Sequence, residues 1–366
     1  MKVLSISSDR NIFNENSEVR QRTIEYGRLA EELHIIVFTK RKLETNPKIQ
    51  ISENTFFYPT DSFSRWSYIF NAVKIAKKII GNYPDKFLVT SQDPFETGLA
   101  GWLIARQFNF PLQLQIHTDF LSSYFRRESF LNKIRVWLAK FLIFRAACLR
   151  VVSERIKKSL AAIGYPLNFV TVLPIFVDVG KIKNAPIKTD LRQKYPQFDF
   201  IILTASRLTR EKNIGLAVEV MAEIIKEYPQ TGLIIVGNGP EELDLKFKIK
   251  NLKLEENVIL EDWTEDLASY YKTADLFLLT SNYEGYGRTL IEAVFSGCGA
   301  ISANVGIADE ILAKENIFEP DDKKALVEKI TKAMKGELLQ IKFRAEIRTK
   351  DQYLEKYKKS WETCSY

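Results

Sequence analysis

Short apolar runs alternate with longer amphipathic segments along most of the chain. In the first half, strands are expected at 3–7, 34–38, 87–90 and 112–117. Helices are expected between them at 18–32, 68–80 and 96–107. Strands that alternate with helix-length segments are typical of βαβ units on a parallel sheet.

A second series of the same kind begins near residue 200. Its expected strands are 200–205, 232–237, 257–260, 275–280 and 299–303. The intervening segment, about 174–195, is richer in Pro, Lys and Asp and has weaker periodicity, so we expect an interdomain linker there. The predicted fold class is α/β, with two Rossmann-like, doubly wound parallel-sheet domains.

Composition narrows the class of protein. A chain of 366 residues is too long for one ordinary core and fits two domains. No stretch approaches the roughly 18 apolar residues that span a bilayer, and no signal peptide is expected, because the first residues read directly as a strand. Cys148, Cys298 and Cys364 lack metal-ligand spacing, and we expect reduced thiols in a cytosol. The net charge of +7 favours anionic partners without choosing among them.

Ligands of parallel sheets bind beyond the carboxyl ends of the strands. Polar and charged residues gather in the loops that follow the expected strands of both halves. These loops are 7–10, 91–93, 117–119 and 153–154 in the first half, and 206–212, 237–240, 261–263 and 281–287 in the second. A cleft between two facing domains would collect both sets.

The stretch 281–293 carries the strongest local signal. It passes from an apolar strand through a turn with Gly285 and Gly287 into a helix. Glycine lets the backbone approach a ligand, and the first helical turn offers free N–H groups to a phosphate. Glu284 and Glu292 flank this turn, and carboxylates there favour a ligand that also carries sugar hydroxyls. Two glutamates at this spacing also occur by chance.

Arg207 and Lys212 follow the first strand of the second half. A guanidinium fork and a nearby ammonium suit a diphosphate. The alternative is a solvated loop whose charges pair with Glu211.

Four features stand in a fixed order in the second half: 205–212 (ASRLTREK), 234–240 (IIVGNGP), 274–281 (ADLFLLTS), and Glu284 with Glu292 separated by seven residues. Together they resemble the retaining family 4 glycosyltransferases, which have the two-domain GT-B fold. The resemblance implies an acceptor-side domain at 1–173 and a nucleotide-sugar-binding domain at 174–345. A C-terminal helix at 346–366 would return to the first domain, or would pack on its own domain instead.

The same resemblance implies a role for each site residue. Arg207 and Lys212 would hold the diphosphate of a nucleotide sugar. Glu292 would bind the ribose hydroxyls, and Glu284 would hold hydroxyls of the donor sugar. His117 would reach that sugar from the first domain; a lone histidine is more often structural, but its place at a strand end favours function. The remaining substrate-binding residues would be Gly285, Tyr286, Gly287, Arg288, Thr289 and Leu290, with Gly237 and the 261–263 loop bordering the base.

Three departures from the family pattern matter. The loop after the first strand, 7–13, has no glycine, which leaves the acceptor site open. Ser206 stands where the family usually has glycine, and 174–178 reads PIFVD in place of the frequent PNGVD.

The implied reaction is transfer of a hexosyl unit with retention, from a UDP- or GDP-sugar to a hydroxyl of a lipid or glycan acceptor. No cofactor is implied. Because the chain has no Asp-x-Asp, and two cations can replace a divalent ion on the diphosphate, we expect no metal. A sugar-nucleotide epimerase or a phosphorylase of the same fold, and a non-catalytic nucleotide-sugar- or glycan-binding protein, are the alternatives. Donor base, donor sugar, acceptor, linkage and oligomeric state stay open.

The segment 120–150 mixes basic and aromatic residues and has one acid, Glu128. Such helices suit the surface of an anionic membrane. We therefore expect a cytoplasmic protein that associates peripherally with the inner face of the plasma membrane. Ordinary core helices with a solvated basic face are the alternative. Nucleic acid is a weaker partner, because no nucleic-acid motif accompanies the charge.

Overall fold

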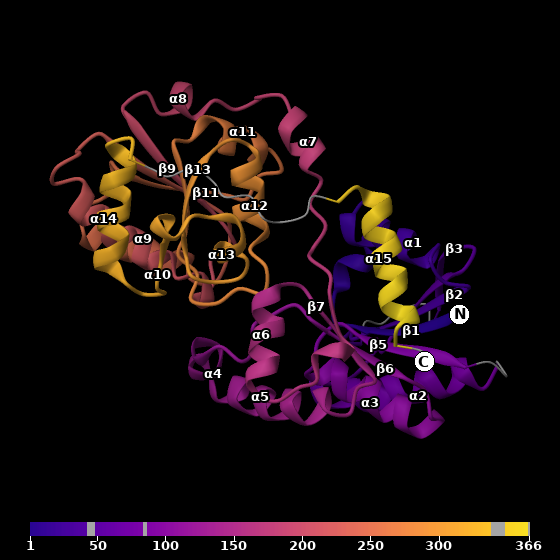
Figure 1. The fold of residues 1–366 in the computed structure, drawn as a ribbon. Helices are drawn as coiled ribbons and strands as arrows, with labels where there is room; N and C mark the ends of the chain where they lie inside the picture. The colour runs from indigo at the N-terminus through magenta and orange to yellow at the C-terminus, as the bar shows by residue number, and fades with distance from the viewer. Residues whose placement is uncertain (42–47, 83–85, 338–347, 365–366) are drawn as a thin grey trace. The chain divides into compact units, whose positions relative to one another are not determined.

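The computed structural model describes residues 1–41, 48–82, 86–337 and 348–364 (Figure 1). The chain divides into two compact units. Unit 1 comprises Met1–His117, Ser129–Pro174 and the described part of Thr349–Tyr366. Unit 2 comprises Thr118–Glu128 and the described part of Ile175–Arg348. Each unit is built on its own largely parallel sheet, so the predicted fold class is confirmed.

The sheet of unit 1 has the strand order β3-β4-β2-β1-β5-β6-β7-β8. Its strands pair in parallel, apart from the antiparallel pair β3 and β4. The strands are β1 (Lys2–Ser7), β2 (Glu32–Val37), β3 (Ile49–Ser52), β4 (Thr55–Pro59), β5 (Phe87–Ser91), β6 (Leu112–Ile116), β7 (Cys148–Val151) and β8 (Val170–Val172).

Helices cover both faces of this sheet. The α2, α3 and α5 helices lie side by side on one face, with α1 and α15 on the other (Figure 1). The helices of unit 1 are η1 (Arg10–Phe13), α1 (Glu18–Gly27), η2 (Arg65–Ser67), α2 (Tyr68–Ile80), α3 (Glu96–Phe108), α5 (Phe130–Ile143), α6 (Glu154–Ala162), η3 (Leu167–Phe169) and α15 (Lys350–Glu362).

The first helix is shorter than its pattern predicts. The expected range 18–32 is wrong at its end, because α1 stops at Gly27 and β2 already begins at Glu32. Gly27 packs directly on β4, where a Cβ would lie 2.0 Å from the Thr55 hydroxyl oxygen. The chain needs the next residues to turn back into the sheet, and this need overrides their helical periodicity.

The last described helix, α15, packs on the sheet of unit 1. Tyr357 stacks on Tyr26 of α1 with ring centroids 4.1 Å apart. The side-chain amide of Gln113 on β6 donates to the Ser360 carbonyl at 2.8 Å, and Trp361 is fully buried. Hydrogen bonds and apolar contacts therefore both hold this helix on the sheet.

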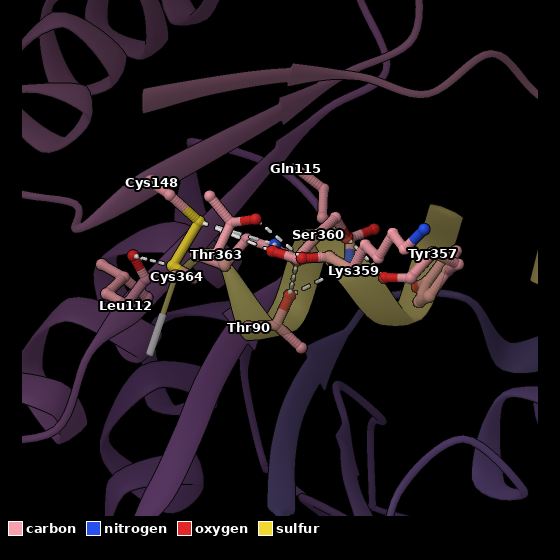
Figure 2. Close-up of a disulfide and its surroundings, with 10 residues drawn as sticks. Thr90, Leu112, Gln115, Cys148, Tyr357, Lys359, Ser360, Thr363 and Cys364 are labelled. Atoms are coloured by element: carbon pink, nitrogen blue, oxygen red, sulfur yellow. Dashed lines mark hydrogen bonds between the residues drawn. A yellow bond between two sulfur atoms is a disulfide. The ribbon is translucent and has the colours of Figure 1, made fainter. Parts of the chain in front are cut away.

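A disulfide joins Cys364, just beyond α15, to Cys148 at the start of β7 (Figure 2). The expectation of reduced thiols is therefore wrong for these two cysteines. The third, Cys298, is free and buried, and burial raises its pKa to about 12, which makes it an unreactive thiol. The sequence could not predict the pairing, since 216 residues separate the partners.

Unit 2 has a parallel sheet of strand order β11-β10-β9-β12-β13-β14. Its strands are β9 (Phe200–Ala205), β10 (Thr231–Val236), β11 (Val258–Glu261), β12 (Leu276–Leu279), β13 (Gly299–Ala303) and β14 (Ile317–Phe318). Its helices are α4 (Ser123–Glu128), α7 (Val179–Asn184), α8 (Leu191–Lys194), η4 (Arg210–Lys212), α9 (Ile214–Ile224), α10 (Glu242–Asn251), α11 (Leu267–Thr273), α12 (Arg288–Phe295), α13 (Ala308–Ile311), η5 (Lys314–Asn316) and α14 (Lys323–Met334).

One short helix of unit 2 comes from the first half of the sequence. Phe125 of α4 meets the Tyr283 ring edge-on at 5.4 Å, and Tyr124 donates to the Pro320 carbonyl at 3.0 Å. The Tyr283 hydroxyl also donates to Glu128. These contacts attach α4 to the loops that follow β12 and β14.

Within the described residues, the helices are all too short or too polar to cross a bilayer.

The disulfide should contribute to the stability of unit 1. Cross-linking distant residues restricts the unfolded chain, so we expect reduction to lower the free energy of unfolding by about 2–4 kcal/mol. Chemical unfolding with and without a phosphine reductant measures this. The Cys148→Ser variant is the control, because reductant should leave it unchanged. Titration of three thiols in the denatured, unreduced wild-type chain would contradict the disulfide.

Candidate functional site

The loops that follow β9 and β12 lie side by side in unit 2, because these two strands are neighbours in the sheet. The backbone N–H of Asn282 donates to the Glu211 carbonyl at 2.8 Å. The Thr280 hydroxyl donates to the Lys212 carbonyl at 2.9 Å. Two segments about 70 residues apart in the sequence are thereby joined at the carboxyl edge of the sheet.

Lys212 and Glu284 form an ion pair at this junction. The Lys212 Nζ lies 2.5 Å from Glu284 Oε1, and the Ser281 hydroxyl donates to the same oxygen at 2.8 Å. Their side chains are only 15% and 13% exposed. Both bonds end on Oε1, so Glu284 Oε2 is the oxygen available to a further donor. The residues that sequence reasoning assigned to two separate loops are thus brought together.

Arg207 takes a different position. Its guanidinium lies 3.3 Å from Glu211 Oε1, and its side chain is 76% exposed. In this structure Arg207 therefore pairs with Glu211, as the alternative interpretation of this loop expected. The pair stands on the same loop as Lys212, and an exposed side chain of this length can exchange its partner for a ligand at little cost.

Glu292 lies one turn inside α12 and is largely buried. Arg288 Nε donates to its Oε1 at 2.6 Å, and the Tyr271 hydroxyl donates to its Oε2 at 3.3 Å. Burial, followed by the Glu292 charge, holds the pKa of Tyr271 well above its usual value, so this hydroxyl remains a donor. Sequence reasoning missed Tyr271, because nothing in its helix marks it as facing α12.

The turn between the two glutamates leads directly into α12. Gly287 is its N-cap, with φ of +95°, a conformation that favours glycine. The Leu290 N–H bonds to the Gly287 carbonyl at 3.1 Å, and the first N–H groups of an α-helix have no partner within the helix itself. Gly306 supports the turn: a Cβ there would lie 2.3 Å from the Tyr286 carbonyl oxygen. Sequence reasoning missed Gly306, although it is a lone glycine just after a strand.

Gly237 follows β10 at the same edge. A Cβ there would lie 1.9 Å from the Ser206 carbonyl oxygen, so only glycine fits. Its N–H donates to the Glu261 carbonyl at 2.9 Å, which ties the loops after β10 and β11 together. The Glu261 side chain is already bound by three donors, Lys194, Tyr195 and Tyr270. Burial raises its pKa, but these hydrogen bonds outweigh burial and lower it, so Glu261 is a structural carboxylate.

His117 follows β6 in unit 1. Its Nε2 lies 3.2 Å from Gln115 Oε1 and 3.5 Å from an Arg150 guanidinium nitrogen. Burial, then the charges of Arg150 and Arg22, lower its pKa to about 3. The imidazole is therefore neutral near pH 7 and can exchange a hydrogen bond without adding a charge.

Arg150 is buried and central to this cluster. It donates to Gln115, and its guanidinium lies 4.3 Å from the centroid of the Tyr357 ring. Tyr357 belongs to α15, so the C-terminal helix supports the residues around His117.

The glycine-free loop after β1 is fixed by side chains. The Ser7 hydroxyl and the Ser8 N–H both donate to Gln92 Oε1, at 2.8 and 3.1 Å. Arg10 donates from Nε to the Phe38 carbonyl at 3.1 Å and from Nη2 to the Tyr68 hydroxyl at 3.0 Å. This loop keeps its shape without glycine.

No cluster of three or more His, Cys, Asp or Glu that could hold a metal ion occurs in the part of the chain that the structure describes.

Each half of the chain matches a known protein family. Residues 26–181 match the family described as Glycosyltransferase Family 4, and residues 188–351 match Glycosyl transferases group 1. The alpha-monoglucosyldiacylglycerol synthase of Streptococcus pneumoniae is 26% identical over 69% of this chain, but that match spans only 59% of the relative's own length.

Two solved structures share the fold. Sucrose-phosphate synthase from Thermosynechococcus elongatus superposes with a TM-score of 0.74 at 18% identity, covering 100% of this chain and 95% of its own. HepE of Anabaena, in complex with UDP-glucose, superposes with a TM-score of 0.68 at 17% identity, with the same coverage. The two family matches and this fold agree with the expected resemblance. The chain belongs to the family 4 glycosyltransferases and has the GT-B fold.

Proposed function

We propose that the chain is a retaining, metal-independent hexosyltransferase. It moves a hexosyl unit from a nucleotide diphosphate sugar to a hydroxyl of a lipid or glycan acceptor. The observation that carries the proposal is the Lys212–Glu284 ion pair beside the N-terminus of α12, with Glu292 one turn inside. A cation, the N-terminus of a helix and two carboxylates match a ligand that joins a diphosphate to two sugars.

Each group takes one part of the donor. Lys212 and Arg207 bind the diphosphate, and Arg207 leaves Glu211 to do so. The backbone of Gly285, Tyr286, Gly287, Arg288 and Thr289 completes the sugar and phosphate site, and Leu290 borders it with its own N–H bonded to the Gly287 carbonyl. Glu284 accepts from sugar hydroxyls with Oε2, while Lys212 and Ser281 hold its Oε1. Glu292 accepts from the ribose after Arg288 moves aside, and Gly237 borders the base.

The reaction proceeds on one face of the sugar. The bond between sugar C1 and the β-phosphate oxygen breaks, and a bond between C1 and the acceptor oxygen forms on the same side. The acceptor proton passes to the departing phosphate oxygen. Lys212 and Arg207 stabilise the charge that develops on this diphosphate, which is electrostatic catalysis. A neutral His117 holds a donor-sugar hydroxyl without competing for the proton.

Relatives suggest the donor and the acceptor class. The HepE complex holds UDP-glucose, and the Streptococcus pneumoniae relative is named for a glucosylated diacylglycerol. We therefore propose a UDP-hexose donor ahead of a GDP-hexose and a lipid acceptor ahead of a glycan. We keep placement on the inner face of the plasma membrane as a prediction. The Cys148–Cys364 disulfide weighs against it, because disulfides are rare in a reducing cytosol.

The donor is tested by thermal shift followed by hydrolysis. We expect a UDP-sugar to raise the melting temperature and the chain to release UDP slowly into water, because water can replace the acceptor. GDP- and ADP-sugars are the controls. Binding without release would favour a non-catalytic sugar-nucleotide protein, and interconversion of epimers without release would favour an epimerase. A chain that binds none of these donors would contradict the proposal.

Substitution of Glu292 and of Glu284 should change different quantities, UDP affinity for the first and kcat for the second. Glu292→Ala loses charge-assisted hydrogen bonds to the ribose, so we expect UDP to bind about 10- to 100-fold more weakly. Glu284→Ala should leave UDP affinity within a few fold and lower kcat by about tenfold or more. Calorimetry and steady-state kinetics measure the two effects. Glu328→Ala on exposed α14 is the control, and unaltered kinetics in both site variants would remove the assigned roles.

His117 should titrate differently without its neighbour. Arg150→Met removes a nearby positive charge, so the pKa of His117 should rise from about 3 toward the ordinary 6.5. Because the folded-state pKa lies below the unfolded value, folding stability falls as pH drops below about 6.5, and this loss should be smaller in the variant. NMR of the two imidazoles, assigned with His34→Asn, measures the change; Lys359→Met is the control. An unchanged His117 pKa would show that Arg150 has no electrostatic effect on it.

A further inference from the structure

Large apolar side chains are exposed along the outer surface of three neighbouring helices of unit 1. These helices are α2 with its preceding η2 turn, α3 and α5. We call this surface the α2–α3–α5 face. Its exposed apolar residues are Trp66, Phe70, Leu103, Phe130, Leu131, Ile134, Trp137 and Phe144. Half-buried Trp102 of α3 links the two ends of the face, because it meets Phe141 of α5 edge-on at 5.4 Å.

The face is hollowed between α2 and α3. An open depression of about 710 Å³ is lined by Trp66, Ile69, Phe70 and Val73 on one side and by Leu103 and Arg106 on the other. Trp66 is 94% exposed and Phe70 is 72% exposed. Contiguous apolar surface of this kind marks an interaction site in a folded protein.

The charges on the face have one sign. Nine cations lie on η2, α2, α3 and on α5 with its adjoining turn: Arg65, Lys74, Lys77, Lys78, Arg106, Lys133, Arg135, Lys140 and Arg145. The same elements carry one acid, Glu96, which already pairs with Arg135 at 2.8 Å. Two of the cations lie over aromatic rings of the face, Arg106 over Trp102 at 5.4 Å and Arg145 over Phe141 at 3.6 Å.

We propose that the α2–α3–α5 face docks on an anionic lipid bilayer, with the hollow between α2 and α3 receiving an apolar lipid chain. This inference rests on the proposed function, because a transferase with a lipid acceptor has to reach that acceptor in a bilayer. Trp and Phe insert at the boundary between headgroups and acyl chains, and Lys and Arg attract the lipid phosphates. The face extends well beyond 120–150, because η2, α2 and α3 contribute its most exposed aromatic residue and its hollow.

The charge pattern selects this occupant over another copy of the chain. A self-complementary interface would bring the same cations against one another, and like charges at an interface oppose association. A bilayer with anionic headgroups offers the opposite charge and an apolar layer at once. Ordinary core helices with a solvated basic face would bury their large apolar side chains. Here the exposed aromatic side chains lie on the same surface as the cations, which disfavours that alternative.

Co-sedimentation with vesicles tests the proposal. The full chain is mixed with phosphatidylcholine vesicles with and without phosphatidylglycerol, at low and high salt. We expect binding that requires phosphatidylglycerol and weakens with salt. The double variant Trp66→Ser/Phe70→Ser should partition about tenfold or more weakly, because it loses two apolar anchors. The matched control is Leu243→Ser/Phe247→Ser on α10 of unit 2, whose side chains are 77% and 68% exposed.

Insertion into the hollow has its own readout. Lipids brominated in the acyl chain should quench wild-type tryptophan fluorescence, and Trp66→Phe should remove a measurable part of that quenching while circular dichroism stays unchanged. Equal binding by the Trp66/Phe70 variant and the wild type would overturn the proposal. Equal weakening by the α10 control would also overturn it, as would a dimer in light scattering that the Trp66/Phe70 variant converts to monomer.

The proposed transferase activity is measured separately from vesicle binding. UDP release in the absence of vesicles should be the same in the Trp66/Phe70 variant and in the wild type. Vesicle binding as described, in a chain that releases no UDP, would reject the transferase and keep the lipid-docking face.

Discussion

The site of unit 2 depends on the ion pair between Lys212 and Glu284. Each charge is largely withdrawn from water, so removing one partner would leave the other charge uncompensated. The pair also connects two loops that the sequence separates by about 70 residues. It holds an ammonium beside the N-terminus of α12 before any ligand arrives. A diphosphate then meets an ammonium that is already in place, which lowers the ordering cost of binding.

In unit 1, a buried charge likewise fixes the state of a neighbouring side chain, the neutral imidazole of His117. Buried Arg150 lies between Tyr357 of α15 and the end of β6, and its charge helps to keep His117 unprotonated. The disulfide (Figure 2) fastens α15 to the same strands. The hydrogen bond from Gln113 to the Ser360 carbonyl does so too. The C-terminal helix is therefore part of the support of His117, although the histidine lies more than 230 residues earlier in the chain.

Regular periodicity made much of the fold predictable. The helix 68–80 and the strands 200–205 and 299–303 occur with the expected bounds. The apolar residues of the first recur at helical spacing, and the other two are short, mostly buried runs. The hairpin of β3 and β4 was missed, since β3 is short and only partly buried. In the site, the glycines and glutamates of 284–292 could be found from one local stretch. The partners Tyr271 and Gly306, and the pairing of Arg207 with Glu211, depend on packing between distant segments, which no local pattern contains.

A crystal structure of the chain with a UDP-hexose tests the central claim most directly. The account predicts Lys212 Nζ within about 3 Å of a diphosphate oxygen, Glu284 Oε2 at hydrogen-bond distance from a hexose hydroxyl, and Glu292 on the ribose. It also predicts that the Lys212–Glu284 pair persists in the complex. A nucleotide bound away from the N-terminus of α12, with that ion pair untouched by ligand, would contradict the account.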